Sequence, residues 1–464
     1  MPPWFHEPGH GSPGGNLYNI SADLSRCDEL ITPACIKALY HVPLGNKAHP
    51  GNTLGIFEDG DFYAQEDLNL FFSNFTPYIP NGTHPTLDSI DGGYAPVNLS
   101  EAGGESSLDL QLTYPLIWPQ GVTLFQTDDI NYSSSNLTNS TGFYNSWLDA
   151  IDGSYCTYSA FGETGNLPID PVYPDPLPGG YKGTLNCGTY EPTNVMSISY
   201  SQQEISVPAN YQRRQCNEFM KLALQGHTIV FSSGDTGVAG RAADPRPNGC
   251  LGPNHTIFNP RWPDSCPYVT VVGATKVYPG KTVFEPESVA NDLAGAPYKT
   301  AYSSGGGFSN IFPIPEFQKT AVNTYFELHD PGYAYYSGDE PLGANGGLYN
   351  RSGRGYPDVS ANGDNMAVYV GGKATREGGT SASTPIFASI ITRINEERLA
   401  IGKTPVGWIN PVLYSHPEVL NDITNGTNPG CGTQGFGAVP GWDPSSGLGT
   451  PHYPRMLELF LSLP

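Results

Sequence analysis

Short apolar runs alternate with helical patterns along the chain from about residue 50 onward. The runs that predict strands are Thr53–Phe57, Val122–Phe125, Val195–Tyr200, His227–Ser232 and Tyr268–Val272. The last two are continuously apolar, which is typical of strands buried on both faces of a sheet. Strands that alternate with helices predict an α/β fold with a mostly parallel sheet and helices on both faces.

Apolar residues at helical spacing predict the helices between these strands. We expect helices at Gln65–Phe72, at Glu105–Leu112 (short and amphipathic), from an N-cap at Ser206 to a stop at Gly226, and after Ser381. The last has an apolar side made of Ile386, Phe387, Ile390, Ile391 and Ile394.

Composition divides the chain into three kinds of segment. Residues 1–25 are rich in Gly, Pro and His and predict a linker left from a precursor segment, so that 26–464 would form one large domain. Residues 126–193 are rich in Asn, Ser, Gly and Pro and predict a long surface insertion. The sequence contains no run of 18 or more uninterrupted apolar residues, so we expect no transmembrane helix.

Acidic residues outnumber basic ones by 44 to 22, which gives a formal net charge of −22 at pH 7. Nucleic-acid binding depends on Lys and Arg that neutralise phosphates, so this balance argues against a nucleic-acid partner. Aromatic residues make up 12% of the chain, which argues against a disordered acidic tail.

Cysteines and glycosylation sequons favour the secretory pathway. Eight Cys permit four disulfides, but 105 pairings are possible and the sequence selects none of them. Ten Asn-x-Ser/Thr sequons predict a glycoprotein, and they begin at Asn19, Asn74, Asn81, Asn98, Asn131, Asn136, Asn139, Asn254, Asn350 and Asn425. Residues 1–30 have no apolar segment typical of a signal peptide, so we expect either a removed precursor segment or an incomplete chain. We therefore expect a secreted, extracellular protein, and an acidic vacuole or lysosome is the alternative location.

The first candidate for chemistry is the segment Gly379-Thr380-Ser381-Ala382-Ser383, which leads into the last predicted helix. Unpaired N–H groups and the positive end of the helix dipole would stabilise an oxyanion formed beside Ser381. The segment resembles the serine motif of subtilisin-like proteases, and Asp235-Thr236-Gly237 imitates their aspartate turn, but no His-Gly-Thr motif exists. A His-based triad is therefore excluded, and a simple Ser/Thr-rich N-cap remains the alternative.

Carboxylates supply a different partner for the serine. Glu105 and Asp109 are four residues apart and would share one face of a helix. A Glu held by a neighbouring Asp can accept the proton of a Ser hydroxyl. Asp235 follows the apolar strand 227–233, at the kind of strand end where sites assemble in open α/β sheets. The alternatives are a solvated helix face for the pair and a turn residue for Asp235.

Together these segments resemble the sedolisins, the serine-carboxyl peptidases with a subtilisin-like fold, from about Ile31 to Pro451. The matching segments occur in the family's order and are Glu105-x-x-x-Asp109, Ser233-Gly234-Asp235-Thr236-Gly237, Ser304–Ser309, Gly355–Ser360, Gly379–Ser383, Asn421-Asp422-Ile423 and Gly441–Pro444. The resemblance implies Ser381 as nucleophile, Glu105 as general base, Asp109 as the residue that orients Glu105, and Asp235 as a protonated donor to the oxyanion.

The resemblance also implies one structural Ca²⁺ ion and a precursor with an N-terminal propeptide. The ion would be held by the carboxylates of Asp422 and Asp443, by carbonyl oxygens of Ile423, Val439 and Gly441, and by water. The chain is most similar to the fungal secreted tripeptidyl-peptidases, so we expect a monomeric acid peptidase that releases N-terminal tripeptides from peptides and proteins. An acid endopeptidase of the same family is the first alternative, and a catalytically silent calcium-bound glycoprotein is a distant one.

Overall fold

The computed structural model describes residues 24–127, 143–156, 170–241, 248–292 and 301–464. Its centre is a sheet with the strand order β16-β8-β6-β4-β1-β3-β2, to which β9 is added beside β8. The strands are β1 Leu54–Glu58, β2 Thr86–Ile90, β3 Val122–Thr127, β4 Val195–Ile198, β6 Thr228–Ser232, β8 Thr270–Lys276, β9 Ser288–Val289 and β16 Val359–Asn362. The subtilisin-like, mostly parallel sheet predicted from the sequence is confirmed.

Every neighbouring pair along this path is parallel, and only the short β9 runs antiparallel to its neighbour. Strand β1 lies between β3 and β4, so Ile56 is in register with Leu124 on one side and with Ser197 on the other. The strand order reverses direction at β1. In open α/β sheets such a reversal places a crevice at the carboxyl ends of the strands.

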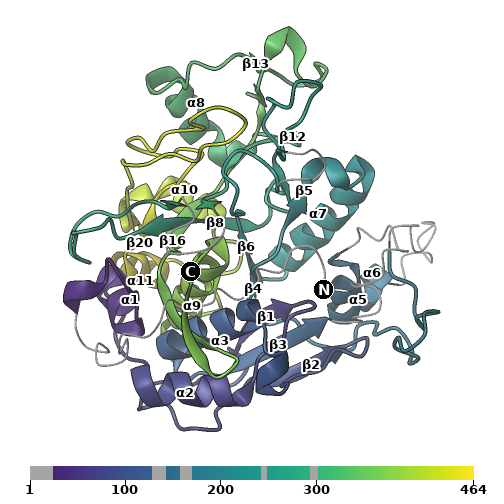
Figure 1. Cartoon of the computed structure of the whole chain (residues 1–464), viewed down its shortest axis with the longest axis vertical. Coiled ribbons are helices and arrows are strands. Elements are labelled where there is room, and N and C mark those ends of the chain that lie inside the picture. The colour runs from purple at the N-terminus through teal and green to yellow at the C-terminus, as the bar shows by residue number, and fades with distance from the viewer. Residues whose placement is uncertain (1–23, 128–142, 157–169, 242–247, 293–300) are drawn as a thin grey trace.

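Both faces of the sheet are buried, as the continuous apolar strands predict. Leu54 and Ile56 belong to the core under the helices α3 (Gly104–Ile117) and α9 (Thr380–Ala400). Phe57 belongs to the second core, with α5 (Asn145–Ile151) and α7 (Ala209–Leu224). Figure 1 shows α3 and α9 side by side near the centre of the molecule, and these two helices pack directly on each other.

Three local predictions need correction. Helix α3 is longer than predicted and is buried from Ser106 to Ile117 rather than amphipathic, because it packs against α9, α2, β17 and β1. Helix α7 begins at Ala209 with Pro208 at its N-cap, whereas Ser206 ends a preceding 3₁₀ turn. The segment predicted as a surface insertion contains α5, whose residues are all buried. Trp147 therefore belongs to the hydrophobic core although it lies within a polar stretch of sequence.

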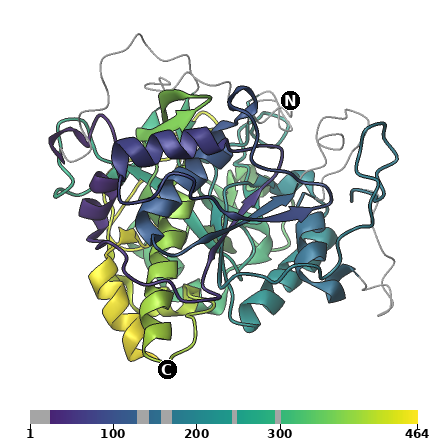
Figure 2. The same ribbon diagram turned by 90° about the horizontal axis from the view of Figure 1, so that it is seen from below.

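The remaining elements connect and cover the sheet. Helix α11 runs beside α9 at the C-terminal end of the chain, as Figure 2 shows. These elements are η1 Leu24–Arg26, α1 Pro33–Tyr40, α2 Gln65–Phe75, η2 Leu99–Glu101, α6 Gly153–Cys156, β5 Gln202–Gln203, η4 Glu204–Ser206, β7 Arg261–Trp262, β10 Asn291–Asp292, β11 Tyr302–Ser303, β12 Gly307–Pro313, η5 Glu316–Gln318, α8 Lys319–Leu328, β13 Tyr335–Tyr336, η6 Ala344–Gly346, β14 Tyr349–Asn350, β15 Gly353–Tyr356, β17 Met366–Val370, β18 Lys373–Glu377, α10 Asn410–Ser415, η7 Pro417–Val419, β19 Leu420–Asn421, β20 Thr450–Pro451 and α11 Tyr453–Ser462.

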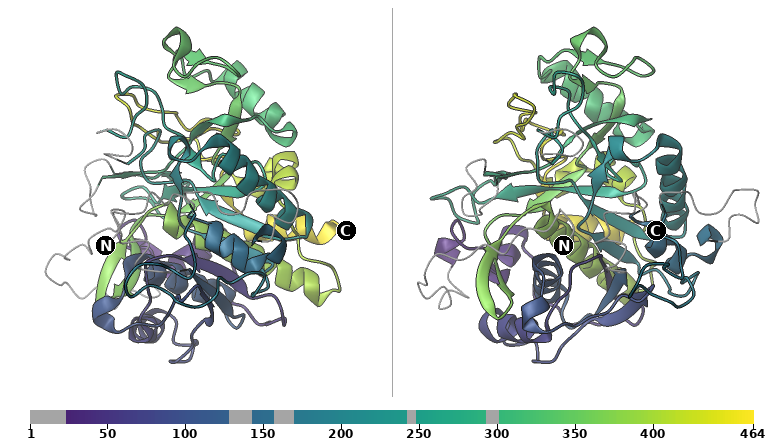
Figure 3. Two further views of the ribbon diagram at one scale, coloured as in Figure 1. Left: turned by 90° about the vertical axis from the view of Figure 1, so that its right-hand side faces the viewer. Right: turned by 45° about the vertical axis from the view of Figure 1, so that its right-hand side comes forward.

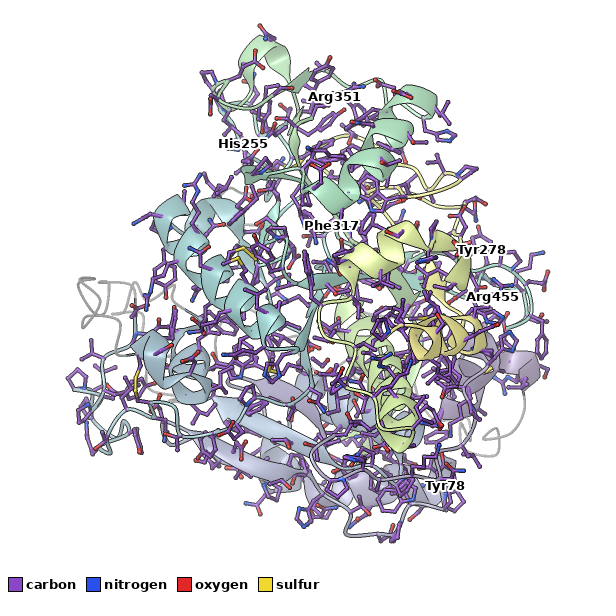
Figure 4. The ribbon with its side chains drawn as sticks, turned by 180° about the vertical axis from the view of Figure 1, so that it is seen from behind. Tyr78, His255, Tyr278, Phe317, Arg351 and Arg455 are labelled. Atoms are coloured by element: carbon purple, nitrogen blue, oxygen red, sulfur yellow. A yellow bond between two sulfur atoms is a disulfide. The ribbon has the colours of Figure 1, made fainter. Side chains whose placement is uncertain are left out.

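One segment, with α8 and β13, projects from the body of the molecule (Figure 3). Arg351 holds it together, with its guanidinium 4.2 Å from the centre of the Phe326 ring and 4.5 Å from that of Tyr335. The same guanidinium is 2.6 Å from Asp330 Oδ2. Figure 4 shows Arg351 in this segment and Tyr78 at the opposite end of the molecule.

All eight cysteines are paired. The disulfides are Cys27–Cys35, Cys156–Cys187, Cys216–Cys266 and Cys250–Cys431. The sequence predicts the number of bridges, and the fold decides their pairing.

Candidate active site

Ser381 is the second residue of α9, and its side chain lies at the carboxyl ends of the central strands. Its hydroxyl donates a hydrogen bond to the carbonyl oxygen of Ser199, just beyond β4, at 3.2 Å. The preceding Gly379 has φ +142°, a conformation that favours glycine. The first N–H groups of a helix have no intrahelical acceptor, so the backbone of Ser381 offers a donor and a positive dipole end to a nearby anion.

Glu105 lies in the first turn of α3 and faces this serine. Burial and the neighbouring Asp109 carboxyl raise the pKa of Glu105 well above its usual range, whereas a hydrogen bond with Ser381 lowers it. The other carboxyl oxygen, Oε1, is buried and has no hydrogen-bond partner among the described residues. A buried carboxylate with a raised pKa is a stronger base than an exposed one, which suits it to accept the hydroxyl proton.

Asp109 lies one turn further along α3 and is completely buried. Ser199 donates its hydroxyl to the Asp109 carboxylate, with oxygen–oxygen distances of 2.8 and 3.1 Å. Burial raises the pKa of Asp109, and this hydrogen bond opposes the rise. Glu105 and Asp109 therefore titrate as a pair, and Ser199 connects that pair to the segment beside Ser381.

Asp235 approaches the serine from the other side. It lies in the turn after β6, and its Oδ1 accepts hydrogen bonds from the Thr380 N–H at 2.8 Å and the Thr380 hydroxyl at 3.0 Å. Its Oδ2 faces Gly379, where an added Cβ would lie 3.1 Å away. The Asp235 carboxyl group is thus fixed directly beside the start of α9. In its protonated form it would be a hydrogen-bond donor next to the nucleophile.

The structure therefore brings together all four residues that the sequence selects for catalysis, from α3, from the end of β6 and from the start of α9. It adds two carboxyl groups that sequence reasoning missed. Glu58 ends β1, and its Oε2 accepts a hydrogen bond from Tyr200 at 2.6 Å. Asp61 follows three residues later, and its Oδ1 accepts a hydrogen bond from the Ser106 N–H at 2.9 Å.

Charge interactions connect these two acids with the others. Burial, followed by the charges of Asp109, Asp61 and Glu105, raises the pKa of Glu58. The sequence did contain a signal that Glu58 and Asp61 belong to the site. Both follow the predicted strand Thr53–Phe57, and functional residues in this fold class lie at the carboxyl ends of strands.

The residues predicted to hold calcium lie in the loop between β19 and β20. Asp422 is exposed and accepts a hydrogen bond from the Gly441 N–H at 2.9 Å, while the buried Asp443 accepts one from the Val439 N–H at 3.0 Å. Ile423, next to Asp422, is buried. Asp443 also accepts hydrogen bonds from the N–H and hydroxyl groups of two serines, Ser445 and Ser446. The donor set consists of oxygens only, which suits a hard cation.

Two further searches concern metals and membranes. In the described ranges, no group of three or more His, Cys, Asp or Glu side chains is placed to hold one metal ion. This search does not cover sites formed mainly by carbonyl oxygens. None of the helices in the same ranges combines the length and hydropathy needed to cross a bilayer.

Comparison with known proteins decides the family. The chain is 62% identical over 445 residues to aorsin from Aspergillus oryzae, which covers 95% of this chain and 67% of aorsin. It is 55% identical over 441 residues to the tripeptidyl-peptidase sed1 of Aspergillus fumigatus, which covers 94% of this chain and 66% of that protein. The chain belongs to the sedolisin family.

A solved structure agrees with this assignment at the level of the fold. Pseudomonas sedolisin, a serine-carboxyl proteinase solved with two molecules of pseudo-iodotyrostatin, superposes with a TM-score of 0.60. The alignment is 20% identical and covers 94% of this chain and 99% of that one. No family model matches the chain. This sedolisin chain spans about two thirds of the length of the two curated relatives.

Proposed function

We propose that this protein is an acid serine-carboxyl peptidase with Ser381 as its nucleophile. The observation that carries the proposal is the convergence of the Ser381 hydroxyl, the Glu105 carboxyl and the Asp235 carboxyl at the start of α9. In the reaction, Ser381 Oγ attacks the peptide carbonyl carbon while Glu105 takes the hydroxyl proton. Asp109 holds Glu105 by sharing a proton with it.

The negative oxygen of the tetrahedral intermediate is stabilised by the Ser381 N–H and by a protonated Asp235. Glu105 then gives its proton to the departing amine, which leaves an acyl-enzyme on Ser381. A water molecule, deprotonated by Glu105, attacks the ester and regenerates the serine. Glu105 must be ionised and Asp235 protonated at the start, so activity should be confined to a limited pH range with a falling limb on each side.

A matched pair of variants tests the nucleophile. Ser381→Ala should lower kcat/KM by at least about a thousandfold, because a lost triad member removes the covalent route. Ser389→Ala removes a buried hydroxyl from the same helix and should change kcat/KM by no more than a few-fold. Equal activity of the two variants would contradict the assignment of Ser381.

We further propose that the products are N-terminal tripeptides. The support is the printed name of the relative that is 55% identical, a tripeptidyl-peptidase. Matched peptides with free and acetylated N-termini, analysed by product mass, test this proposal. Release of tripeptides from the free form alone supports it. Equal internal cleavage of both forms would replace it with the endopeptidase alternative.

A secreted glycoprotein is the proposed cellular form, made as a precursor with a propeptide as the family resemblance implies. Its four disulfides support an oxidising compartment. We expect glycans at the exposed Asn81, Asn98 and Asn254. Asn350 should stay unmodified, because it is buried and donates a hydrogen bond to the Ser309 carbonyl at 2.9 Å. Peptide mapping after enzymatic deglycosylation of secreted protein distinguishes these sites.

We also propose one structural Ca²⁺ ion in the loop between β19 and β20. The support is that hydrogen bonds tie Asp422 to Gly441 and Asp443 to Val439, so the proposed oxygen donors belong to one folded loop. The ion would supply charge neutralisation for Asp443, whose pKa burial raises to about 7.

A further inference from the structure

Asp61 lies against the first turn of the helix that carries the proposed base. Only 2% of the residue is exposed. Its Oδ1 accepts the 2.9 Å hydrogen bond from the N–H of Ser106, the residue directly after Glu105. The N-cap of α3 is Gly103, which has no side chain to cap the helix, so Asp61 supplies that acceptor from outside the helix.

The position of Asp61 is fixed from three directions. A Cβ added to Gly103 would lie 2.0 Å from Asp61 Oδ2, so glycine is what allows this close approach. The Gly103 N–H donates to the Phe62 carbonyl at 2.8 Å. From β3, the Gln126 amide donates to the Asp61 carbonyl at 3.1 Å. These contacts hold the carboxyl group and the start of α3 as one unit.

The second carboxyl oxygen of Asp61 faces other acids. It is buried and lacks a hydrogen-bond partner in the part of the chain that the structure describes. Burial raises the pKa of Asp61 to about 7, while backbone N–H groups at the helix start oppose the rise. The titratable groups that interact with it come from β1, α3, β18 and the segment after β4, and they are Glu58, Glu105, Asp109, Glu377 and Tyr200.

We propose that Asp61 is a positioning residue for Glu105: its Oδ1 fixes the first turn of α3 and so holds the Glu105 carboxyl beside Ser381. The proposal rests on the proposed function, because it takes Glu105 as the general base. The physical reason is that Glu105 directly precedes Ser106, so an acceptor for the Ser106 N–H fixes the backbone from which the Glu105 side chain extends.

Two substitutions test the hydrogen bond. Asp61→Asn keeps an acceptor oxygen for the Ser106 N–H. Asp61→Ala removes it. The matched control is Asp67→Ala, which removes a buried aspartate on α2 that accepts the N–H groups of Gly371 and Gly372 at 2.8 Å each and is not among the charges that act on Glu105.

The measurement is kcat and kcat/KM of the purified variants in the acid range. Asp61→Ala should lose about tenfold or more in kcat, because Glu105 is no longer held. Asp61→Asn should keep kcat within a few-fold of wild type, because it retains the acceptor and because burial raises the pKa of Asp61 to about 7, so the wild-type group is also neutral in acid. Asp67→Ala should leave kcat within a few-fold of wild type.

Two results would overturn the proposal. One is an Asp61→Ala enzyme that keeps the wild-type kcat, or an Asp61→Asn enzyme that loses as much kcat as Asp61→Ala. The other is an Asp61→Asn chain that fails to fold, because the proposal assigns the structural role to the acceptor oxygen that Asn retains. A wild-type protein without Ser381-dependent activity would instead refute the proposed function, so the two failures are distinguishable.

Discussion

The stability of this protein should fall as the pH rises from acid to neutral, and Asp264 gives the clearest test. Asp264 follows β7 and is completely buried. Burial raises its pKa from 3.8 to about 7, even though the charges of Arg261 and Arg354 act in the opposite direction. Between these two values the folded protein holds a proton that the unfolded chain has released. The stabilisation is thus complete below the unfolded pKa and is lost as the pH rises through the folded one.

The slope follows from linkage. One group that binds a proton only in the folded state lowers the free energy of unfolding by about 1.4 kcal/mol per pH unit. Asp61 and Glu204 are also buried, with pKa values raised to about 7, and act in the same direction. The wild-type protein should therefore lose several kcal/mol across this range, a large part of an ordinary folding free energy of about 5–15 kcal/mol.

Asp264→Asn is a neutral substitution of nearly the same shape. It should flatten the plot of unfolding free energy against pH by about 1.4 kcal/mol per unit between roughly pH 5 and 6. Urea unfolding at several pH values measures this slope, and Glu101→Gln, at an exposed position, is the control that should leave it unchanged. Parallel plots for wild type and Asp264→Asn would refute the reasoning, as would a wild-type protein that gains stability toward neutral pH.

Three further predictions concern the site and the calcium loop. Ser199→Ala leaves the buried Asp109 carboxylate without its hydroxyl donor and should cost about 1–3 kcal/mol of unfolding free energy as well as activity; unchanged urea midpoint and kcat/KM would remove Ser199 from the network. Asp235→Asn keeps a donor that does not titrate, so it should lower the maximum of the pH profile and extend residual activity toward neutral pH; an unaltered basic limb would contradict the oxyanion role. Asp443→Ala, or excess chelator, should lower the melting temperature, because an ion bound only by the folded state stabilises it; an unchanged melting temperature after verified metal removal would count against the site.

Much of the fold followed from local patterns. The strand ending at Ser232 and the helix beginning at Thr380 were predictable because a continuous apolar run and a helical apolar stripe are strong signals. The placement of Asp235 near Ser381 was predictable for a related reason. Asp235 and Ser381 each lie at the end of a well-marked element, and sites in this fold class assemble there.

Residues whose roles depend on contacts between distant segments could not be predicted. Ser199 is an ordinary serine in the sequence, and only the fold brings the segment after β4 close enough to α3 for its hydroxyl to reach Asp109. The burial of α3 was likewise hidden, because Glu105 and Asp109 suggest a solvated face until α9 is placed over it. The disulfide partners were undetermined for the same reason, since Cys250 and Cys431 are 181 residues apart.

The packing of α3 on α9 has a consequence for how activity is acquired. Glu105 and Ser381 are far apart in the sequence and meet only in the folded protein. The parallel strands β1, β4 and β6 that align them are also joined by long connections. Contacts between residues so distant in sequence form late in folding, because loop closure has to precede them. A nascent or partly folded chain would thus carry the nucleophile and the base without joining them. Hydrolytic competence would then coincide with completion of the sheet, which protects unfinished copies from digesting one another.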